Sequence, residues 1–435
     1  MIKSVFKAFR PAFFISLLAA VLVSGGVRAA TPTIEVLHVE GTIVPIVADY
    51  IDRGIEQAET KGSTVVIIQL STPGGLLDTT QKIVERILNA KVPVVVYVSP
   101  AGGWAGSAGT FITLASHIAA MAPGSRIGAA TPVAMGDGMT EDMKRKVTED
   151  AAAWIRSIAE MRGRDPEHAE LAVREGASYT VTEALEHNLI DLRADSLQSL
   201  ISQLNGMKLT LVTGEEITLN TEGYMLDKTE MSIIERFLHA ISDPNIAYIL
   251  LSLGTIGIIA EIYNPGALFP GITGAICLLM AFYSLGVLDA YWGGILLILL
   301  AFGLFIAEVL TTTFGLLTAG GITALVLGSL ILFPRGAPLF QVDPWLIATV
   351  VIIIVAFFAF AVDRIIRARR RQAYTGREEL IGKTAIVKVA LDPEGTVFFK
   401  GERWAAISEK GRVEPGEKVI ITKVDGLQLY VTKKE

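Results

Sequence analysis

The chain has 435 residues, of which 51% are hydrophobic, and its mean hydropathy is +0.50. This composition is too apolar for a purely soluble protein, so part of the chain must lie in a lipid bilayer. The net charge of −6 gives no general attraction to nucleic acid, and we expect no nucleic-acid partner. The single cysteine, Cys277, lies in an apolar stretch, which excludes intramolecular disulfides and a cysteine nucleophile in the soluble part. We expect no metal and no cofactor.

The first thirty residues have the pattern of a secretory signal peptide. The basic residues Lys3, Lys7 and Arg10 precede an apolar run at 12–23, and a small-residue cleavage sequence follows at 27–29. An uncleaved anchor is the alternative, although the run is shorter than the ~20 residues that a membrane span needs. Either interpretation exports the segment that follows.

Residues 31–205 alternate β-rich apolar runs with segments of helical periodicity. This alternation is typical of βαβ units and of a largely parallel sheet, so it predicts one compact α/β domain. The clearest strand candidates are 34–39, 65–70 and 94–98. Residues 206–243 read as a connector, charged toward its end.

Five apolar stretches of 18 to 20 residues follow, and they predict a multi-span helical membrane region over 244–363. They lie at 244–263, 269–288, 291–310, 314–333 and 345–362. Five arginines crowd just past the last stretch, between Arg364 and Arg371, so the positive-inside rule places that end in the cytoplasm. An exported α/β domain, five spans and a cytoplasmic C-terminus are mutually consistent. Glu261 and Glu308 lie near span ends, where we expect interfacial placement.

The last sixty residues form short alternating apolar runs separated by Gly, Pro and Asp turns. Five such runs predict a small all-β, OB-like barrel over 376–435. This segment carries 11 Lys and Arg against 10 Asp and Glu, which is far from the basic footprint of a nucleic-acid-binding module. Protein contact or assembly is therefore the predicted role.

Two glycine-rich loops in the α/β domain are candidates for acyl-transfer chemistry. Residues 71–75 directly follow a strand, and residues 102–109 lie between a strand and a helix, where α/β sheets place their sites. Ser107 is the candidate nucleophile, because it begins a helix whose positive end favours developing negative charge. The N–H groups of Gly75 and Ala108 are candidate oxyanion donors, and Gly74 is a candidate substrate contact. From the chemistry alone, both loops could equally be tight turns.

A serine nucleophile needs a base, and the residues leave the choice open. His117 follows Ser107 by ten residues, which in a continuous helix would separate them by ~15 Å, so we expect a packing position. Lys146 flanks the predicted buried stripe of an amphipathic helix that includes Met143 and Val147, and partial burial would favour the neutral amine. From the residues alone, a solvated charge run at Lys144–Lys146 is the favoured interpretation.

The whole layout resembles the long form of the NfeD family, whose N-terminal domain is similar to ClpP and to signal peptide peptidase A. The resemblance rests on Thr72-Pro73-Gly74-Gly75, on Gly106-Ser107-Ala108-Gly109-Thr110, on the segments 121–124 and 127–129, and on Thr182-Glu183-Ala184-Leu185. It implies a ClpP/crotonase-like fold and a Ser/Lys dyad. Lys146 is the best match to the family lysine, and its choice over Lys144 depends on the helical register after the loop 131–140.

The family resemblance also implies a stomatin-like membrane protein as substrate or partner, and fold analogy implies a homo-oligomer. The sequence thus predicts a membrane-bound serine endopeptidase that cleaves apolar segments near the bilayer. Two alternatives remain open at this point. One is crotonase-type acyl-CoA chemistry, which export disfavours. The other is a non-catalytic membrane scaffold that organises stomatin-like proteins.

Overall fold

The computed structural model describes residues 32–133, 140–263, 266, 268–288, 290–311, 315–333, 341–370 and 380–434. The predicted signal segment therefore lies outside the described residues. The contacts divide the chain into two units, Met1–Ile352 and Ile353–Glu435.

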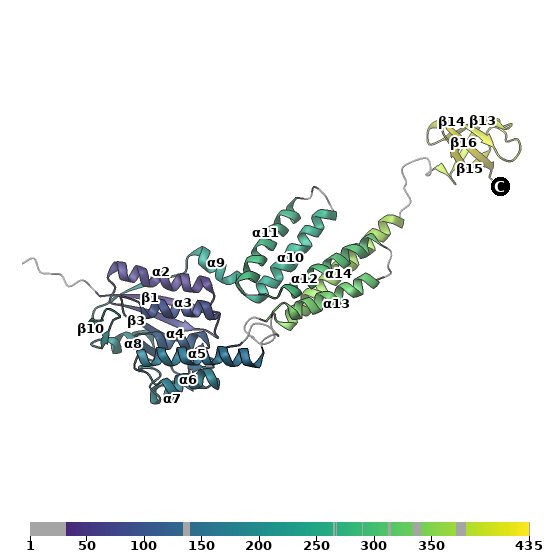
Figure 1. The fold of residues 1–435 in the computed structure, drawn as a ribbon. Helices are drawn as coiled ribbons and strands as arrows, with labels where there is room; N and C mark the ends of the chain where they lie inside the picture. Colours follow the sequence, from purple (N-terminus) through teal and green to yellow (C-terminus); the bar gives the residue numbers. More distant parts are fainter. Residues whose placement is uncertain are drawn as a thin grey trace, which may run out of the picture. The chain divides into compact units, whose positions relative to one another are not determined.

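A six-stranded parallel sheet forms the centre of the N-terminal domain, in the order β11-β1-β2-β3-β5-β8 (Figure 1). Its strands are β1 (Thr33–Glu40), β2 (Val65–Ser71), β3 (Val94–Val98), β5 (Ile118–Met121), β8 (Leu192–Arg193) and β11 (Met225–Thr229). The central strand β3 is buried along its whole length, as its Val-rich run predicts for a strand covered on both faces. The α/β class expected from the sequence is confirmed.

Eight helices follow or connect these strands. They are α2 (Pro45–Lys61), α3 (Leu77–Leu88), α4 (Ala108–Ala115), α5 (Glu141–Met161), α6 (Pro166–Arg174), α7 (Val181–Glu186), α8 (Leu197–Leu204) and α9 (Ile233–Ile241). One core cluster packs α2, α3, α4 and α5 residues against one side of the sheet, and a second cluster packs α8 residues against the other.

Two short sheets accompany the main one. β4 (Trp104–Gly106), β6 (Arg126–Gly128) and β7 (Ser178–Thr180) form a three-stranded sheet, and β9 (Lys208–Thr210) pairs with β10 (Glu216–Thr218). β11 lies in the segment that reads as a connector, yet it extends the main sheet by pairing in parallel with β1. β11 is short and contains polar residues, so its sequence lacks the apolar alternation that predicts a strand.

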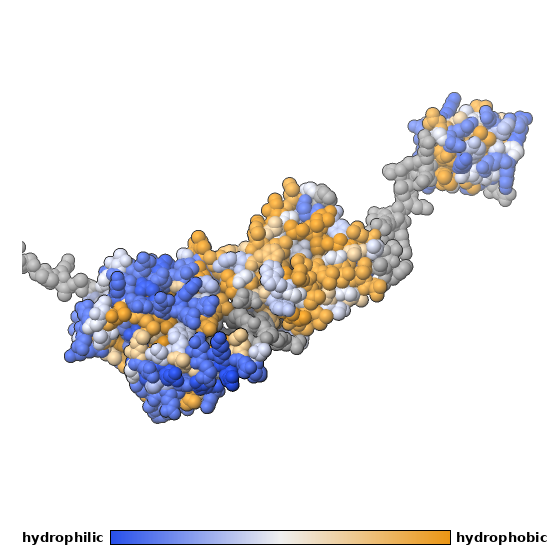
Figure 2. All heavy atoms as spheres, viewed as in Figure 1, coloured by the Kyte–Doolittle hydropathy of each residue, from blue (hydrophilic) through white to orange (hydrophobic). Residues whose placement is uncertain are grey.

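Five apolar helices form the membrane region: α10 (Pro244–Tyr263), α11 (Phe269–Val287), α12 (Trp292–Leu310), α13 (Leu316–Ile331) and α14 (Pro344–Arg370). Of the described residues, α10 and α11 are the two helices long and apolar enough to cross a bilayer by length and composition. Glycines let neighbouring helices approach closely: a Cβ on Gly257 of α10 would lie 2.8 Å from Gly274 Cα of α11. Figure 2 shows the hydrophobic surface of this region.

The two acidic residues near span ends bind loop amides. Glu308 is 9% exposed and accepts hydrogen bonds from the N–H groups of Gly315 (2.9 Å) and Thr318 (3.1 Å) at the start of α13. Glu261 accepts one from the N–H of Gly266 at 3.2 Å. Both carboxylates therefore satisfy backbone donors where a helix ends or begins, which gives each a structural role.

The C-terminal unit contains a closed five-stranded barrel, in the order β12-β13-β14-β16-β15. Its strands are β12 (Thr384–Val389), β13 (Glu394–Phe399), β14 (Glu402–Ser408), β15 (Lys418–Asp425) and β16 (Gln428–Lys433). The buried residues alternate along β12, β15 and β16, as expected for a barrel with one face inward. The predicted small β-barrel is confirmed.

Candidate active site

A backbone bridge holds the two glycine-rich loops side by side. The N–H of Thr72 donates to the carbonyl of Trp104 (2.6 Å), and the N–H of Gly106 donates to the carbonyl of Thr72 (3.0 Å). This bridge joins the end of β2 to β4. Gly74 and Gly75 come two and three residues after Thr72, and Ser107 comes two residues after Ala105. Both loops emerge at the carboxyl ends of parallel strands, where α/β sheets place their sites.

Ser107 has a strained backbone. Its φ is 49° and its ψ is −111°, a conformation that a residue with a Cβ rarely adopts. The strain is maintained from both sides, because its N–H donates to the Gly128 carbonyl (3.0 Å) and its own carbonyl accepts from the Thr110 N–H (2.9 Å). Its side chain is partly exposed at the N-terminus of α4. Backbone strain of this kind clusters at functional sites.

The N–H groups of Gly75 and Ala108 are free of hydrogen bonds within the described part of the chain. Ala108 is the first residue of α4, where N–H groups lack an intrahelical partner. The residues on either side of Gly75 make the backbone bonds to Ile43. The Ile43 N–H donates to Gly74 O (2.9 Å), and the Leu76 N–H donates to Ile43 O (2.9 Å). An oxyanion hole requires two unengaged donors of this kind aimed at one point.

Glycine is needed at position 75, because a Cβ there would lie 2.1 Å from Ile43 O and 2.6 Å from Ile43 Cα. Gly74 takes a φ of 134°, which also favours glycine. Its N–H donates to Thr72 Oγ1 (3.0 Å) and its carbonyl accepts from Ile43. The backbone groups of Gly74 are thus already engaged.

Thr110 is a supporting residue for which the sequence predicted no role of its own. Its hydroxyl lies 3.0 Å from both the Ala105 and the Gly128 carbonyl oxygens, and it accepts from the Gly128 N–H at 3.1 Å. It therefore ties the strand before Ser107 to the strand that holds the Ser107 N–H. The only signal in the sequence is its place within the Gly106–Thr110 motif.

Two arginines fix the opposite end of α4. Arg162 Nε donates to the carbonyl of Ala115 (2.7 Å), and Arg164 Nη1 donates to those of Leu114 (2.6 Å) and Ser116 (3.0 Å). Arg164 is 4% exposed and pairs with Asp191 at 2.7 Å. Burial lowers the pKa of Arg162 to about 10, so it stays charged at neutral pH. Cations at a helix C-terminus stabilise the helix, here the one that begins at Ser107.

His117 is a packing residue, as predicted. α4 ends at Ala115, so His117 lies beyond the helix rather than on it. Its Nδ1 accepts from the Val94 N–H at 3.2 Å. Burial, followed by the charges of Arg162 and Arg164, lowers the pKa of His117 to about 3, which keeps the ring neutral. These contacts describe a structural histidine.

Lys146 is exposed, so the partial burial considered for it is wrong and the solvated charge run is what the structure shows. The first six residues of α5, Glu141 to Lys146, are all exposed, and Met143 of the predicted buried stripe is 47% exposed. Val147 and Thr148 are partly buried, and full burial begins at Ala151, five residues after Lys146. Trp154 then stacks on Phe111 of α4 at 4.5 Å between ring centroids. In the described part of the chain, no hydrogen bond joins Ser107 to Lys146.

Lys144 is also exposed and pairs with Glu141 at 3.4 Å. Part of the preceding loop, 134–139, lies outside the described residues.

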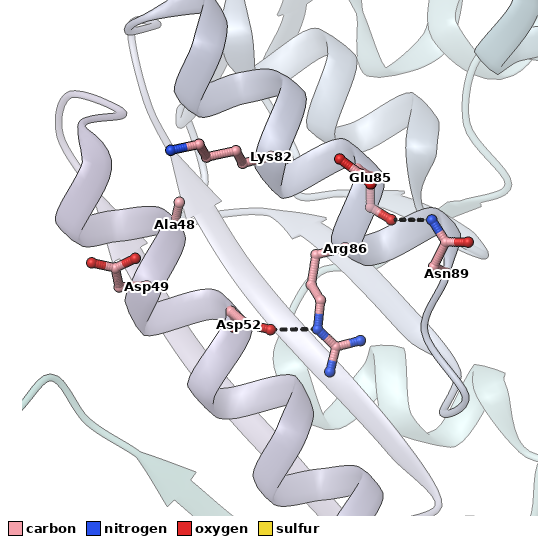
Figure 3. Close-up of a pocket in the computed structure, with 7 residues that line it drawn as sticks. All are labelled: Ala48, Asp49, Asp52, Lys82, Glu85, Arg86 and Asn89. Atoms are coloured by element: carbon pink, nitrogen blue, oxygen red, sulfur yellow. Dashed lines mark hydrogen bonds and ion pairs between the residues drawn. The ribbon is translucent and has the colours of Figure 1, made fainter.

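A surface hollow of about 460 Å³ is lined by residues of α2 and α3 and by Asn89, and Ser107 is not among them (Figure 3). Charged side chains line it, and Arg86 bonds both Asp52 (2.5 Å) and Glu59 (3.0 Å). Because Asp52 and Glu59 engage Arg86, and the hollow is an exposed surface feature, we do not take it as a second candidate site.

Comparison with known proteins places the whole chain in one family. Residues 33–203 match the model of the NfeD1b N-terminal domain, 245–363 that of the NfeD integral membrane domain, and 377–433 that of the NfeD-like C-terminal, partner-binding domain.

Three individual relatives illustrate the match. Membrane-bound protease PH1510 of Pyrococcus horikoshii is 39% identical over 412 residues, which cover 92% of this chain and 93% of that protein. Membrane protein NfeD1b of Bacillus subtilis is 28% identical over 98% of both chains. A solved structure of the 1510-N membrane-bound stomatin-specific protease, a lysine-to-alanine variant with a substrate peptide, is 35% identical over 49% of this chain and 98% of that one, with a TM-score of 0.45. The chain therefore belongs to the NfeD family of membrane proteins, in the long form that includes a membrane-bound protease.

Proposed function

We propose that this protein is a membrane-bound serine endopeptidase in which Ser107 is the nucleophile. The Thr72–Ala105 bridge carries the proposal, because it sets a strained serine beside a loop with a free N–H. The 39%-identical relative of matching length is named a membrane-bound protease, which supports the same chemistry.

In the proposed reaction, Ser107 Oγ attacks the carbonyl carbon of the scissile peptide bond while a base takes the hydroxyl proton. The negative charge that develops on the carbonyl oxygen accepts hydrogen bonds from the N–H groups of Gly75 and Ala108. The proton passes to the leaving amine, and water then hydrolyses the acyl-enzyme. Gly74 contributes to substrate binding by leaving space, free of a Cβ, next to the oxyanion donors.

Lys146 is the proposed general base. A lysine accepts a proton only as the neutral amine, and desolvation favours that form. Since the described chain leaves this end of α5 exposed, the proposal requires that substrate, or a second copy of the chain, covers it in the active complex. The expected homo-oligomer would supply such cover.

The proposed substrates are apolar segments of membrane-associated proteins, with a stomatin-like protein as substrate or partner. The match of residues 377–433 to a partner-binding domain supports a protein partner at the barrel. We further propose that the peptidase domain is extracytoplasmic and the barrel cytoplasmic, from the signal-like start and the arginines at the C-terminal end of α14.

Hydrolysis of an apolar fluorogenic peptide by the purified full-length protein tests the proposal. Ser107→Ala should abolish turnover, while Ser63→Ala, which removes a buried hydroxyl without a hydrogen-bond partner in the described residues, should retain it. Equal turnover in Ser107→Ala and wild type would refute the assignment of the nucleophile.

A further inference from the structure

The helix α9 (Ile233–Ile241) has one polar face bonded to the peptidase domain and one bare apolar face. It is an independently capped element: Ser232 and Glu235 form a capping box at its N-terminus. Its sequence joins the α/β domain to the first membrane helix.

The polar face holds α9 to the domain at two points. Glu235 forms a bidentate ion pair with Arg53 of α2, at 2.9 and 2.7 Å, and its side chain is 13% exposed. One turn later, His239 Nε2 lies 3.3 Å from the carbonyl oxygen of Thr42. Because a bidentate arginine–carboxylate pair fixes the orientation of the two side chains as well as their contact, the polar face of α9 is held toward α2.

The opposite face carries large apolar side chains without cover. Ile233 is 86% exposed, Ile234 is 70% exposed and Phe237 is 48% exposed. At about 100° per residue, Phe237 lies on the other side of the helix from Glu235. Three large apolar side chains on one side of a nine-residue helix mark an interaction surface.

Continuity with the membrane helices identifies what covers this face. α9 ends at Ile241, whose carbonyl accepts a hydrogen bond from Ser284 Oγ of α11, and α10 begins at Pro244. Within the described ranges, α10 and α11 meet the length and composition needed to cross a bilayer. An amphipathic helix joined to the end of a span lies at the level of the lipid headgroups, with its apolar side chains toward the acyl chains.

We propose that α9 docks on the bilayer surface through Ile233, Ile234 and Phe237 and holds the catalytic edge of the peptidase domain at the membrane. β11 ends at Thr229, so α9 leaves the sheet at the same carboxyl edge as the two glycine-rich loops. The contact from His239 to Thr42 continues directly to the oxyanion loop, since the next residue, Ile43, bonds Gly74 and Leu76. A docked α9 thus places the site next to apolar segments that leave the bilayer.

Fluorescence quenching by spin-labelled lipid tests the docking without any catalytic readout, so its outcome is independent of the proposed peptidase activity. The full-length protein carries Cys277→Ala, a single Phe237→Cys labelled with NBD, and sits in phosphatidylcholine nanodiscs containing doxyl-labelled phosphatidylcholine. The same label at Ile233→Cys gives a second reading of the face. Glu215→Cys, in the exposed turn between β9 and β10, is the control.

Docking predicts that doxyl lipid reduces NBD emission at positions 237 and 233 by about twofold or more, while emission at Glu215→Cys changes little. Emission at positions 237 and 233 that matches the control would overturn the proposal. Disulfide cross-linking of two chains through Phe237→Cys, with no lipid quenching, would also overturn it and would assign the face to a second copy of the chain.

Discussion

Replacing Gly75 by alanine should disable the oxyanion hole while leaving the domain folded. The new Cβ would lie 2.1 Å from Ile43 O and 2.5 Å from Ile43 Cβ, well inside ordinary van der Waals contact. Both atoms belong to Ile43, in the segment between β1 and α2. Because the closer atom is a backbone oxygen, which cannot rotate away as a side chain can, the Gly75 loop itself must move by about 1 Å. That shift lengthens or breaks the two bonds between Ile43 and the loop.

Two lost backbone bonds correspond to about 1–3 kcal/mol in the free energy of unfolding. The displacement of one oxyanion donor should lower kcat by about 10²–10³-fold, with a smaller change in KM. Steady-state hydrolysis of an apolar fluorogenic peptide, with thermal unfolding measured in parallel, separates the two effects. Gly303→Ala is the matched control, because a Cβ there meets nothing within 4 Å. A folded Gly75→Ala variant with kcat within about threefold of wild type would refute this role for the loop.

Three further predictions address the base, the buried histidine and the topology. Lys146→Arg should lower kcat/KM by about 10²–10⁴-fold because guanidinium cannot act as a base, while Lys144→Ala keeps most activity; the reverse pattern would reassign the base. His117 has a folded pKa of about 3, below its unfolded value of ~6.5, so acidification from pH 6.5 should destabilise the fold by about 3 kcal/mol at pH 4. In urea unfolding, His117→Asn should weaken this pH dependence, and parallel wild-type and variant profiles would contradict it. Reporters fused after Asn205 and after the C-terminus should lie on opposite sides of the membrane, and detection on one side would exclude the topology.

Apolar runs in the sequence predicted those strands and helices that are themselves strongly apolar. The valines of 94–98 became the fully buried β3, and the long apolar stretches became α10 to α14. The elements β4, β6 and β11 were not predicted, because strands of three to five residues are held by pairing partners distant in the sequence. α9 was overlooked for a related reason: Glu235, Arg236 and His239 make its segment look like a charged connector.

The sequence likewise predicted one part of the candidate site and not the other. The glycine spacing around Ser107 and Gly75 predicted two loops, and the Thr72–Ala105 bridge brings them together. Periodicity also placed Met143 on the buried stripe of α5, but α5 extends beyond the surface against which its later residues pack. Periodicity identifies the face of a helix that could be buried, whereas tertiary packing decides how much of that face is covered.

Covalent labelling of Ser107 tests the central claim most directly. The full-length protein in nanodiscs is treated with a fluorophosphonate probe, and the labelled peptide is located by mass spectrometry. An activated serine beside an oxyanion hole should carry the label on Ser107, and Ser107→Ala should lose it while keeping its thermal stability. A label on another residue that persists undiminished in Ser107→Ala would contradict the account.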